Sequence, residues 1–155
     1  MKRIVMLIVM FSMLSIFTGC SSKKTNDSPD MVVKTFATII CDVLNGKTPN
    51  LEIYNGLWQN KSLARRTMEE IAMPGSHLIV PLQNRGEITY LLGKNESIQK
   101  NDKHLRFVGI SNKNSKNIYG CFALAIIKVN DKYYIANGGY VTEPSVKNRD
   151  FYKEP

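Results

Sequence analysis

The chain has 155 residues, of which 43% are hydrophobic, and its formal net charge is +8. This length fits one ordinary domain with its own core. The lysines are scattered among asparagines rather than massed on one helix. The charge therefore predicts a solvated surface with mild attraction to anionic lipid or cell-wall polymer rather than a nucleic-acid-binding face.

The N-terminus combines a short basic start, Lys2 and Arg3, with an almost unbroken apolar run over residues 4–17. The run is shorter than a typical membrane-spanning helix and has the length of the apolar region of a secretory signal peptide. Gly19 provides a small residue immediately before Cys20. These features predict export from the cytoplasm.

The segment Phe17-Thr18-Gly19-Cys20, followed by Ser21-Ser22-Lys23-Lys24, resembles the lipobox of bacterial lipoproteins. The resemblance implies that residues 1–19 are a cleaved signal peptide and that Cys20 is acylated, which anchors the mature protein to a membrane. It places the protein in the cell envelope, on the outer membrane facing the periplasm in a Gram-negative host or on the outer face of the plasma membrane in a Gram-positive host. An ordinary signal peptide with a chance cysteine and an uncleaved anchor are the alternatives. Export also argues against a nucleic-acid partner.

Residues 20–27 are polar and, with the lipidated cysteine, predict a tether. Ser28 and Pro29 then predict the start of a helix, because serine caps free backbone N–H groups and proline fits the first helical position. Gly46 predicts its end. The apolar residues between them recur at spacings of three and four and form one stripe. They are Val33, Phe36, Ala37, Ile40, Val43 and Leu44.

Residues 51–58 predict a short helix or irregular structure, and residues 62–73 predict a second helix. The pairs Arg65–Glu69 and Arg66–Glu70 are spaced four apart, as surface ion pairs on a helix require. Strands are predicted where Ile, Val, Leu, Tyr and Phe gather between polar turns. These ranges are 77–82, 87–92, 105–111, 118–129 and 132–141.

Asn130-Asp131 predicts a two-residue hairpin turn, because both residues tolerate positive φ. Gly138-Gly139 predicts a bulge or a close backbone contact. The order of elements predicts an α+β fold, with a long N-terminal helix and a second shorter helix packed on a curved antiparallel sheet of about five strands. This single domain is expected over residues 28–144, with a polar tail over residues 145–155.

Two segments carry a second resemblance. Ser28-Pro29-x-x-Val32-Val33-x-x-Phe36 resembles the opening helix of small bacterial lipoproteins with a nuclear-transport-factor-2-like (cystatin-like) domain. Residues 126–135 resemble the closing hairpin of that family, with Tyr133 where tryptophan is usual. The resemblance implies a sheet that curls around the first helix and leaves a conical cavity, used for ligands in some members and for catalysis in others. No catalytic motif of the family matches this chain.

Cys41 and Cys121 remain once Cys20 is assigned to lipid. Exported proteins meet an oxidising compartment, in which two leftover cysteines often form a disulfide. Both residues lie in apolar stretches, however, where buried free cysteine is also common. A Cys41–Cys121 disulfide and two buried thiols therefore both remain open. No catalytic thiol is expected, because neither cysteine has a histidine or a basic cluster beside it.

Aromatic and apolar side chains on the first helix and the strands are the candidates for lining such a cavity. They are Phe36, Ile40, Tyr90, Tyr119, Tyr133 and Tyr140. Tyrosine suits a hydrogen-bonding wall around a ligand, and it suits equally a strand position that spans core and solvent.

No metal site or cofactor is expected. His77 and His104 are far apart in the sequence, and neither a His-x-His nor a Cys-x-x-Cys motif occurs. An acid–base enzyme would need a desolvated carboxylate, and the loose candidates Glu52, Glu87 and Asp102 are not embedded in apolar strands. The chain is therefore not expected to be an enzyme.

The sequence predicts a lipid-anchored cell-envelope protein with a small non-enzymatic domain that binds a protein, a peptide or a small apolar ligand. One alternative is an immunity or exclusion lipoprotein, whose basic surface would meet an acidic toxin or phage protein. The other is a ligand-processing enzyme acting in the conical cavity. The oligomeric state is not indicated.

Overall fold

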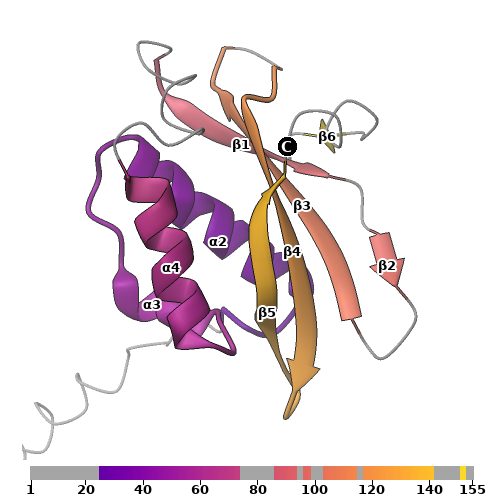
Figure 1. Cartoon of the computed structure of the whole chain (residues 1–155). Coiled ribbons are helices and arrows are strands. Elements are labelled where there is room, and N and C mark those ends of the chain that lie inside the picture. The colour runs from indigo at the N-terminus through magenta and orange to yellow at the C-terminus, as the bar shows by residue number, and fades with distance from the viewer. Residues whose placement is uncertain are drawn as a thin grey trace, which may run out of the picture.

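The computed structural model describes residues 25–73, 86–93, 96–98, 103–114, 117–141 and 151–152. Helices pack on one side of an antiparallel sheet, so the predicted α+β class is confirmed (Figure 1). The helices are α2 (Pro29–Leu44), α3 (Leu51–Gly56) and α4 (Lys61–Ala72). The strands are β1 (Ile88–Gly93), β2 (Glu96–Ile98), β3 (Lys103–Asn112), β4 (Gly120–Val129), β5 (Lys132–Val141) and β6 (Phe151–Tyr152).

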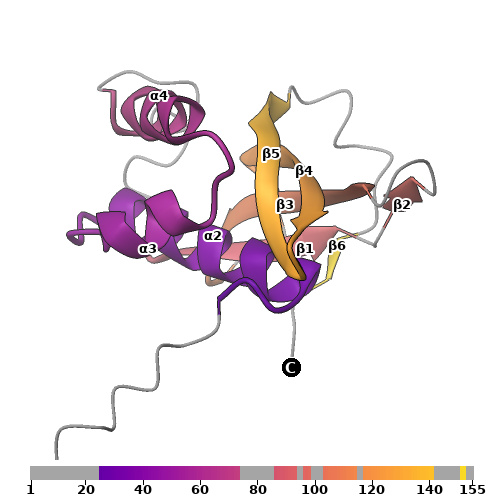
Figure 2. The same ribbon diagram turned by 90° about the horizontal axis from the view of Figure 1, so that it is seen from below.

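The strand order is β5-β4-β3-β1-β6, and the short strand β2 pairs with β3 outside this order. Among the described residues the sheet therefore has six strands, and the short strands β2 and β6 were not predicted. The predicted strand over residues 77–82 lies outside the described residues. Figure 2 shows that β5 runs across the direction of β3, so the sheet twists strongly from one edge to the other.

Helix α2 begins and ends close to the residues that the local sequence predicts. Ser28 Oγ accepts a hydrogen bond from the Met31 N–H at 3.2 Å, and Pro29 occupies the first helical turn. After the helix, Gly46 adopts φ of +75°, and its N–H donates to the Val43 carbonyl at 3.0 Å. The sequence thus fixes the position of α2 by signals within a few residues of each end.

The β4–β5 hairpin has the predicted two-residue turn. Asn130 and Asp131 both adopt positive φ, at 48° and 59°, and Val129 pairs with Lys132 across the turn. Further along, Ile126 pairs with Ile135 but Ala125 pairs with Asn137, so one extra residue bulges out of β5. The predicted irregularity near Gly138-Gly139 is therefore present just before these glycines.

The core lies between the helices and one face of the sheet. Phe36 of α2 is at its centre, with ring contacts to Tyr54 at 6.3 Å, to Trp58 at 6.2 Å and to Phe122 at 5.5 Å between centroids. Alternate strand residues such as Leu124 and Ile126 complete it. This aromatic cluster occupies the space between α2 and the sheet.

Tyr54 and Trp58 each place a polar atom inside the core. The Tyr54 hydroxyl donates to the Ala64 carbonyl at 3.1 Å. Burial raises the pKa of this hydroxyl, and the neighbouring Trp58 indole N–H lowers it. That N–H lies near the Tyr54 oxygen without reaching hydrogen-bond geometry, which leaves it as the unpartnered buried side-chain donor among the described residues.

Contacts of the folded domain extend beyond residues 28–144 at both ends. Asn26 belongs to the folded domain rather than to the tether, because it forms hydrogen bonds with Tyr133 and Gly56. Part of the predicted tail also belongs to the sheet, since β6 pairs with Leu92 and Gly93 of β1. Neither contact was predicted, because the surrounding residues are polar and each contact joins positions far apart in the sequence.

Candidate functional site

The chain enters the domain along the outer edge of β5, where Asn26 pairs with Tyr133. The Tyr133 N–H donates to the Asn26 carbonyl at 2.9 Å, and Asn26 Nδ2 donates to the Tyr133 carbonyl at 2.8 Å. The same Nδ2 donates to the Gly56 carbonyl at 3.1 Å. Asn26 therefore satisfies both outward backbone groups of one edge-strand residue and fixes where the preceding chain leaves the domain.

The next outward position of β5 is covered by the segment after α3. The Ile135 N–H donates to the Leu57 carbonyl at 2.8 Å, and the Gln59 N–H donates to the Ile135 carbonyl at 3.0 Å. Trp58 forms an isolated parallel bridge with Ile135 between these bonds. The first half of the β5 edge is thus closed against pairing with another chain.

We call the end of the sheet next to Asn26 the tether end. It contains Lys103 and His104 at the start of β3, Lys128 at the end of β4, and Lys132 and Tyr133 at the start of β5. The His104 and Tyr133 rings meet edge to face with centroids 5.7 Å apart. Lys128 Nζ lies 6.0 Å from the Tyr133 ring centroid and 3.0 Å from Asp131 Oδ1.

A buried arginine links the tether end to the first turn of α2. Arg106 is 8% exposed on β3, and its Nε lies 3.3 Å from Oδ1 of the half-exposed Asp30. Its Nη1 also donates to the Leu105 carbonyl at 3.4 Å. The negative charge of Asp30 suits both this guanidinium and the positive end of the helix dipole. This ion pair thus joins β3 to the start of α2.

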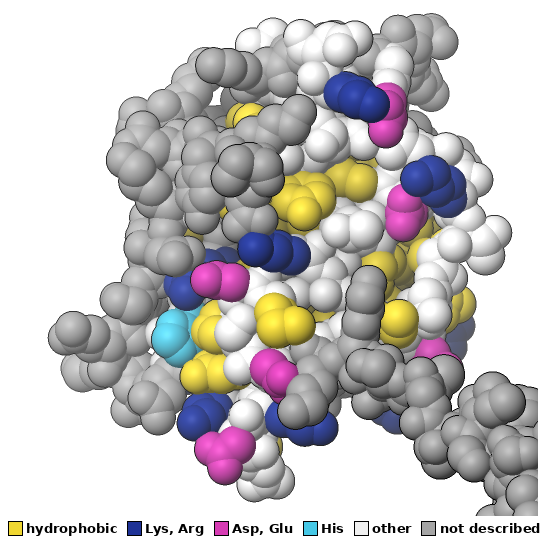
Figure 3. Space-filling view, turned by 180° about the vertical axis from the view of Figure 1, so that it is seen from behind, with side chains coloured by type: hydrophobic (Ala, Val, Ile, Leu, Met, Phe, Trp, Pro, Cys, Tyr) yellow, Lys and Arg dark blue, Asp and Glu magenta, His cyan; other side chains and the backbone are white. Residues whose placement is uncertain are grey.

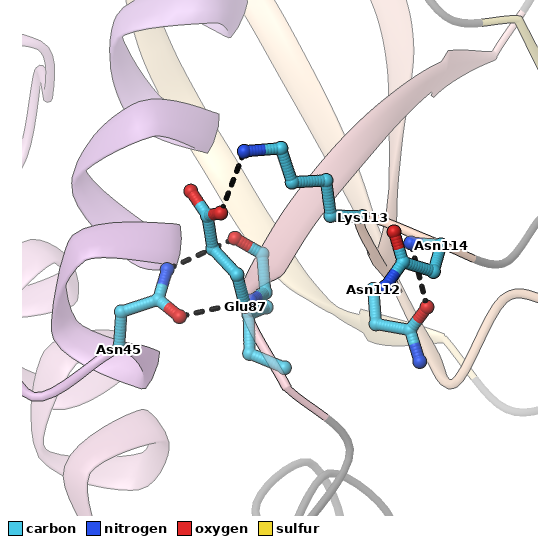
Figure 4. A network of polar contacts seen from close by, with 6 residues as sticks. Asn45, Glu87, Asn112, Lys113 and Asn114 are labelled. Atoms are coloured by element: carbon cyan, nitrogen blue, oxygen red, sulfur yellow. Dashed lines mark hydrogen bonds and ion pairs between the residues drawn. The ribbon is translucent and has the colours of Figure 1, made fainter.

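The opposite end of the sheet, which we call the far end, is held by a second asparagine. Asn45, just after α2, donates through Nδ2 to the Ile88 carbonyl at 2.9 Å and accepts from the Ile88 N–H at 2.8 Å. Figure 4 shows this pair beside the ion pair between Lys113 Nζ and Glu87 Oε2, which are 2.8 Å apart. Sequence reasoning missed both Asn26 and Asn45, whose partners lie 107 and 43 residues away.

The six candidate cavity residues do not come together. Phe36 and Ile40 have no exposed surface and belong to the hydrophobic core. Tyr90 and Tyr119 are half-buried and pack against the core near the far end. Tyr133 lies at the tether end, whereas Tyr140 lies near the other end of β5, 39% exposed, with its ring against Phe122.

Cys41 and Cys121 are both buried, and no disulfide joins them. Cys41 faces the core from α2, whereas Cys121 alternates with the core residues Phe122 and Leu124 and so lies on the other face of β4. The sheet therefore separates the two sulfur atoms, and the disulfide left open by the sequence does not form. Burial and the charge of Asp42 raise the pKa of the Cys41 thiol to about 12, although Lys47 opposes this shift.

The two described carboxylates that were considered for catalysis, Glu52 and Glu87, are exposed rather than desolvated. Glu52 is exposed on α3, and Glu87 is exposed and paired with Lys113. His77 and Asp102 lie outside the described residues. Within the part of the chain that the structure describes, no group of three or more His, Cys, Asp or Glu side chains is placed to hold a metal ion.

The predicted lipidation site, Cys20, also lies outside the described residues. None of the described helices is both long enough and apolar enough to cross a membrane. Figure 3 shows basic and acidic side chains lying side by side across the back of the molecule rather than in one charged area. The chain matches no protein-family model, no curated protein and no solved structure in comparisons with each.

Proposed function

We propose that the protein is a lipid-anchored cell-envelope protein whose domain binds a protein, a peptide or a small apolar ligand without catalysing a reaction. The observation that carries the proposal is the apolar run over residues 4–17 that ends in Gly19-Cys20. The position of Asn26 supports it, because the domain begins only a few residues after the expected acylated cysteine. An acylated Cys20 would then hold the domain close to the membrane surface.

We also propose that the fold is of the nuclear-transport-factor-2-like type, with α2 as its long first helix and a curled sheet of about five main strands. The order of elements supports this assignment, since helices precede an antiparallel run that ends in the β4–β5 hairpin. The conical space of that family would be occupied here by the rings of Phe36, Tyr54, Trp58 and Phe122.

The state of the reactive groups supports a non-enzymatic role. A general acid or base needs a pKa near the working pH and a position facing a substrate. The Cys41 thiol is buried with a pKa of about 12 and therefore stays protonated at neutral pH. Glu87 is exposed and paired with Lys113, so it does not lie in a desolvated site facing a substrate.

Acylation is tested by expressing the full chain and its Cys20→Ser variant in a bacterial host fed with labelled palmitate. We expect label and membrane fractionation for the native chain and the loss of both for Cys20→Ser. The Cys41→Ser variant is the matched control and should keep both. Equal labelling and membrane association of native chain and Cys20→Ser would overturn the proposed anchor.

The binding role is tested by cross-linking intact cells and recovering the protein from solubilised envelopes under denaturing conditions. A partner that is recovered repeatedly with the native chain, and not with an unrelated lipoprotein, would support a protein or peptide ligand. Apolar ligands are sought by mass spectrometry of an organic extract of the purified protein. Turnover of an extracted compound by the protein would contradict the non-enzymatic assignment.

A further inference from the structure

We infer that the tether end of the sheet faces the membrane and that Lys103, Lys128 and Lys132 contact anionic phospholipid head groups there. This inference rests on the proposed acylation of Cys20. It adds an orientation for the domain and a surface with a defined partner.

The length of the tether excludes the opposite orientation. From Cys20 to Asn26 the chain spans no more than about 20 Å, even when fully extended. Asn26 is held at Tyr133, the second residue of β5, and β5 continues to Val141, roughly 26 Å further along. A lipid on Cys20 therefore cannot reach past the far end of the sheet, and the far end cannot be the end of the domain that rests on the bilayer.

The tether end carries exposed basic side chains that suit an anionic surface. Lys103 pairs with Ile127 and Lys132 pairs with Val129, so both lie beside the β4–β5 turn. Both side chains are exposed, and no acidic side chain of the described residues forms an ion pair with either. Lys128 lies between Ile127 and Val129 along β4, so its side chain is on the other face of the sheet, with Asp131 as its ion-pair partner.

The part of the chain that the structure describes also has acidic residues at this end, and two of the three form ion pairs with basic side chains. Asp30 pairs with the buried Arg106, and Asp131 pairs with Lys128. Asp27 is exposed beside Asn26 and offsets part of the basic charge. Among the described residues of the tether end, the basic Lys103, Arg106, Lys128 and Lys132 outnumber the acidic Asp27, Asp30 and Asp131. The sequence also has Lys23 and Lys24 close to Cys20.

The described residues of the far end show no such excess of basic charge. The lysines described there, Lys47 and Lys113, are each paired with an acidic side chain, Asp42 at 3.0 Å and Glu87 at 2.8 Å. These two lysines are also exposed. They therefore serve as internal controls in the same molecule, because they should react with a soluble reagent whether or not a membrane is present.

The experiment measures lysine accessibility in the mature lipoprotein. The protein is purified from membranes and placed in detergent micelles, in phosphatidylcholine vesicles, and in vesicles of phosphatidylcholine with phosphatidylglycerol. A membrane-impermeant acetylating reagent modifies exposed lysines, and peptide mass spectrometry gives the labelling of each. The labelling of Lys103, Lys128 and Lys132 is divided by that of Lys47 and Lys113. Protein enclosed inside vesicles is not reached by the reagent, so it lowers both values alike and does not change the ratio.

We expect this ratio to fall about fivefold in the anionic vesicles relative to micelles, which corresponds to the attraction of one basic residue to such a surface. The ratio should recover when salt is raised to about 1 M, because salt screens the attraction. An unchanged ratio in anionic vesicles overturns the inference. An equal fall in phosphatidylcholine alone overturns the assignment of anionic head groups as the partner.

The same digest separates failure of this inference from failure of the proposed function. An N-terminal peptide with acyl chains on Cys20, found together with an unchanged lysine ratio, would support the proposed anchor and contradict the proposed orientation. An N-terminal peptide without acyl chains would contradict both the anchor and the orientation. Protection of the lysines only when an envelope extract is added would identify a protein as the occupant of this surface and would overturn the lipid assignment.

Discussion

Gly138 of β5 lies directly against the indole ring of Trp58. A Cβ atom added at Gly138 would be 3.1 Å from Trp58 Cη2 and 2.9 Å from Leu124 Cδ2. Both neighbours are buried in the core, so neither can move freely. The absence of a side chain at Gly138 therefore allows Trp58 to pack on the sheet while its backbone bridges Ile135.

Gly138→Ala is expected to lower the free energy of unfolding by about 2 kcal/mol, because an extra methyl group overpacks the core. Gly139→Ala is the matched control, since a Cβ atom at Gly139 would meet nothing within 4 Å. Urea unfolding followed by tryptophan fluorescence measures both variants. Equal stability of the two variants would show that Trp58 and Leu124 can move aside.

The sequence predicted those features of the fold that depend on neighbouring residues. Ser28 and Pro29 locate the start of α2, and Asn130-Asp131 locates the hairpin turn, because each signal acts within a few residues. The ion pairs Arg65–Glu69 and Arg66–Glu70 form as their spacing on a helix requires. Local physical chemistry is sufficient for all of these.

The candidate site could not be predicted in the same way. Tyr133 and Tyr140 are separated by an odd number of positions, so strict alternation would place them on opposite faces of β5. The bulge opposite Ala125 and Ile126 changes the alternation, and both tyrosines contact residues of the helix-facing side. Asn26 has no local signal at all, because its partner Tyr133 is 107 residues away.

Asn45→Ala is expected to reduce stability by about 2 kcal/mol, because it leaves the N–H and carbonyl groups of Ile88 without their partner. Asn55→Ala is the matched control. Asn55 is also half-buried next to a helix end, and its side chain forms no hydrogen bond with the described residues. Hydrogen exchange should show faster exchange of the Ile88 amide in Asn45→Ala alone. An unchanged Ile88 amide would mean that Asn45 does not hold β1.

Cys41 and Cys121 are expected to remain thiols in the protein isolated from the envelope, because they lie on opposite faces of the sheet. Alkylation should be slow in the folded protein, in which both residues are buried, and complete for both after denaturation in urea. Mass spectrometry of unreduced peptides gives the result. A peptide linked through Cys41 and Cys121 would contradict this arrangement of the helix and the sheet.

The stability of the protein is expected to fall above pH 9 because of Cys41 and Tyr54. Folding raises the pKa of Cys41 from 9.0 to about 12 and raises that of Tyr54 above its ordinary value of 10.0. Below pH 9 both groups are neutral in the folded and unfolded states, so their contribution to stability is fully present. As the pH rises further, the unfolded chain loses these protons first, and each group lowers stability by up to about 1.4 kcal/mol per pH unit.

The Cys41→Ala variant separates the thiol from other alkaline effects. It should be less stable than the native chain at pH 8, because it loses buried contacts, but its stability should fall less steeply between pH 9 and pH 12. Urea unfolding at fixed pH values gives both slopes. Parallel slopes would show that Cys41 titrates alike in the folded and unfolded chains, which would place its sulfur in contact with water rather than between α2 and the sheet.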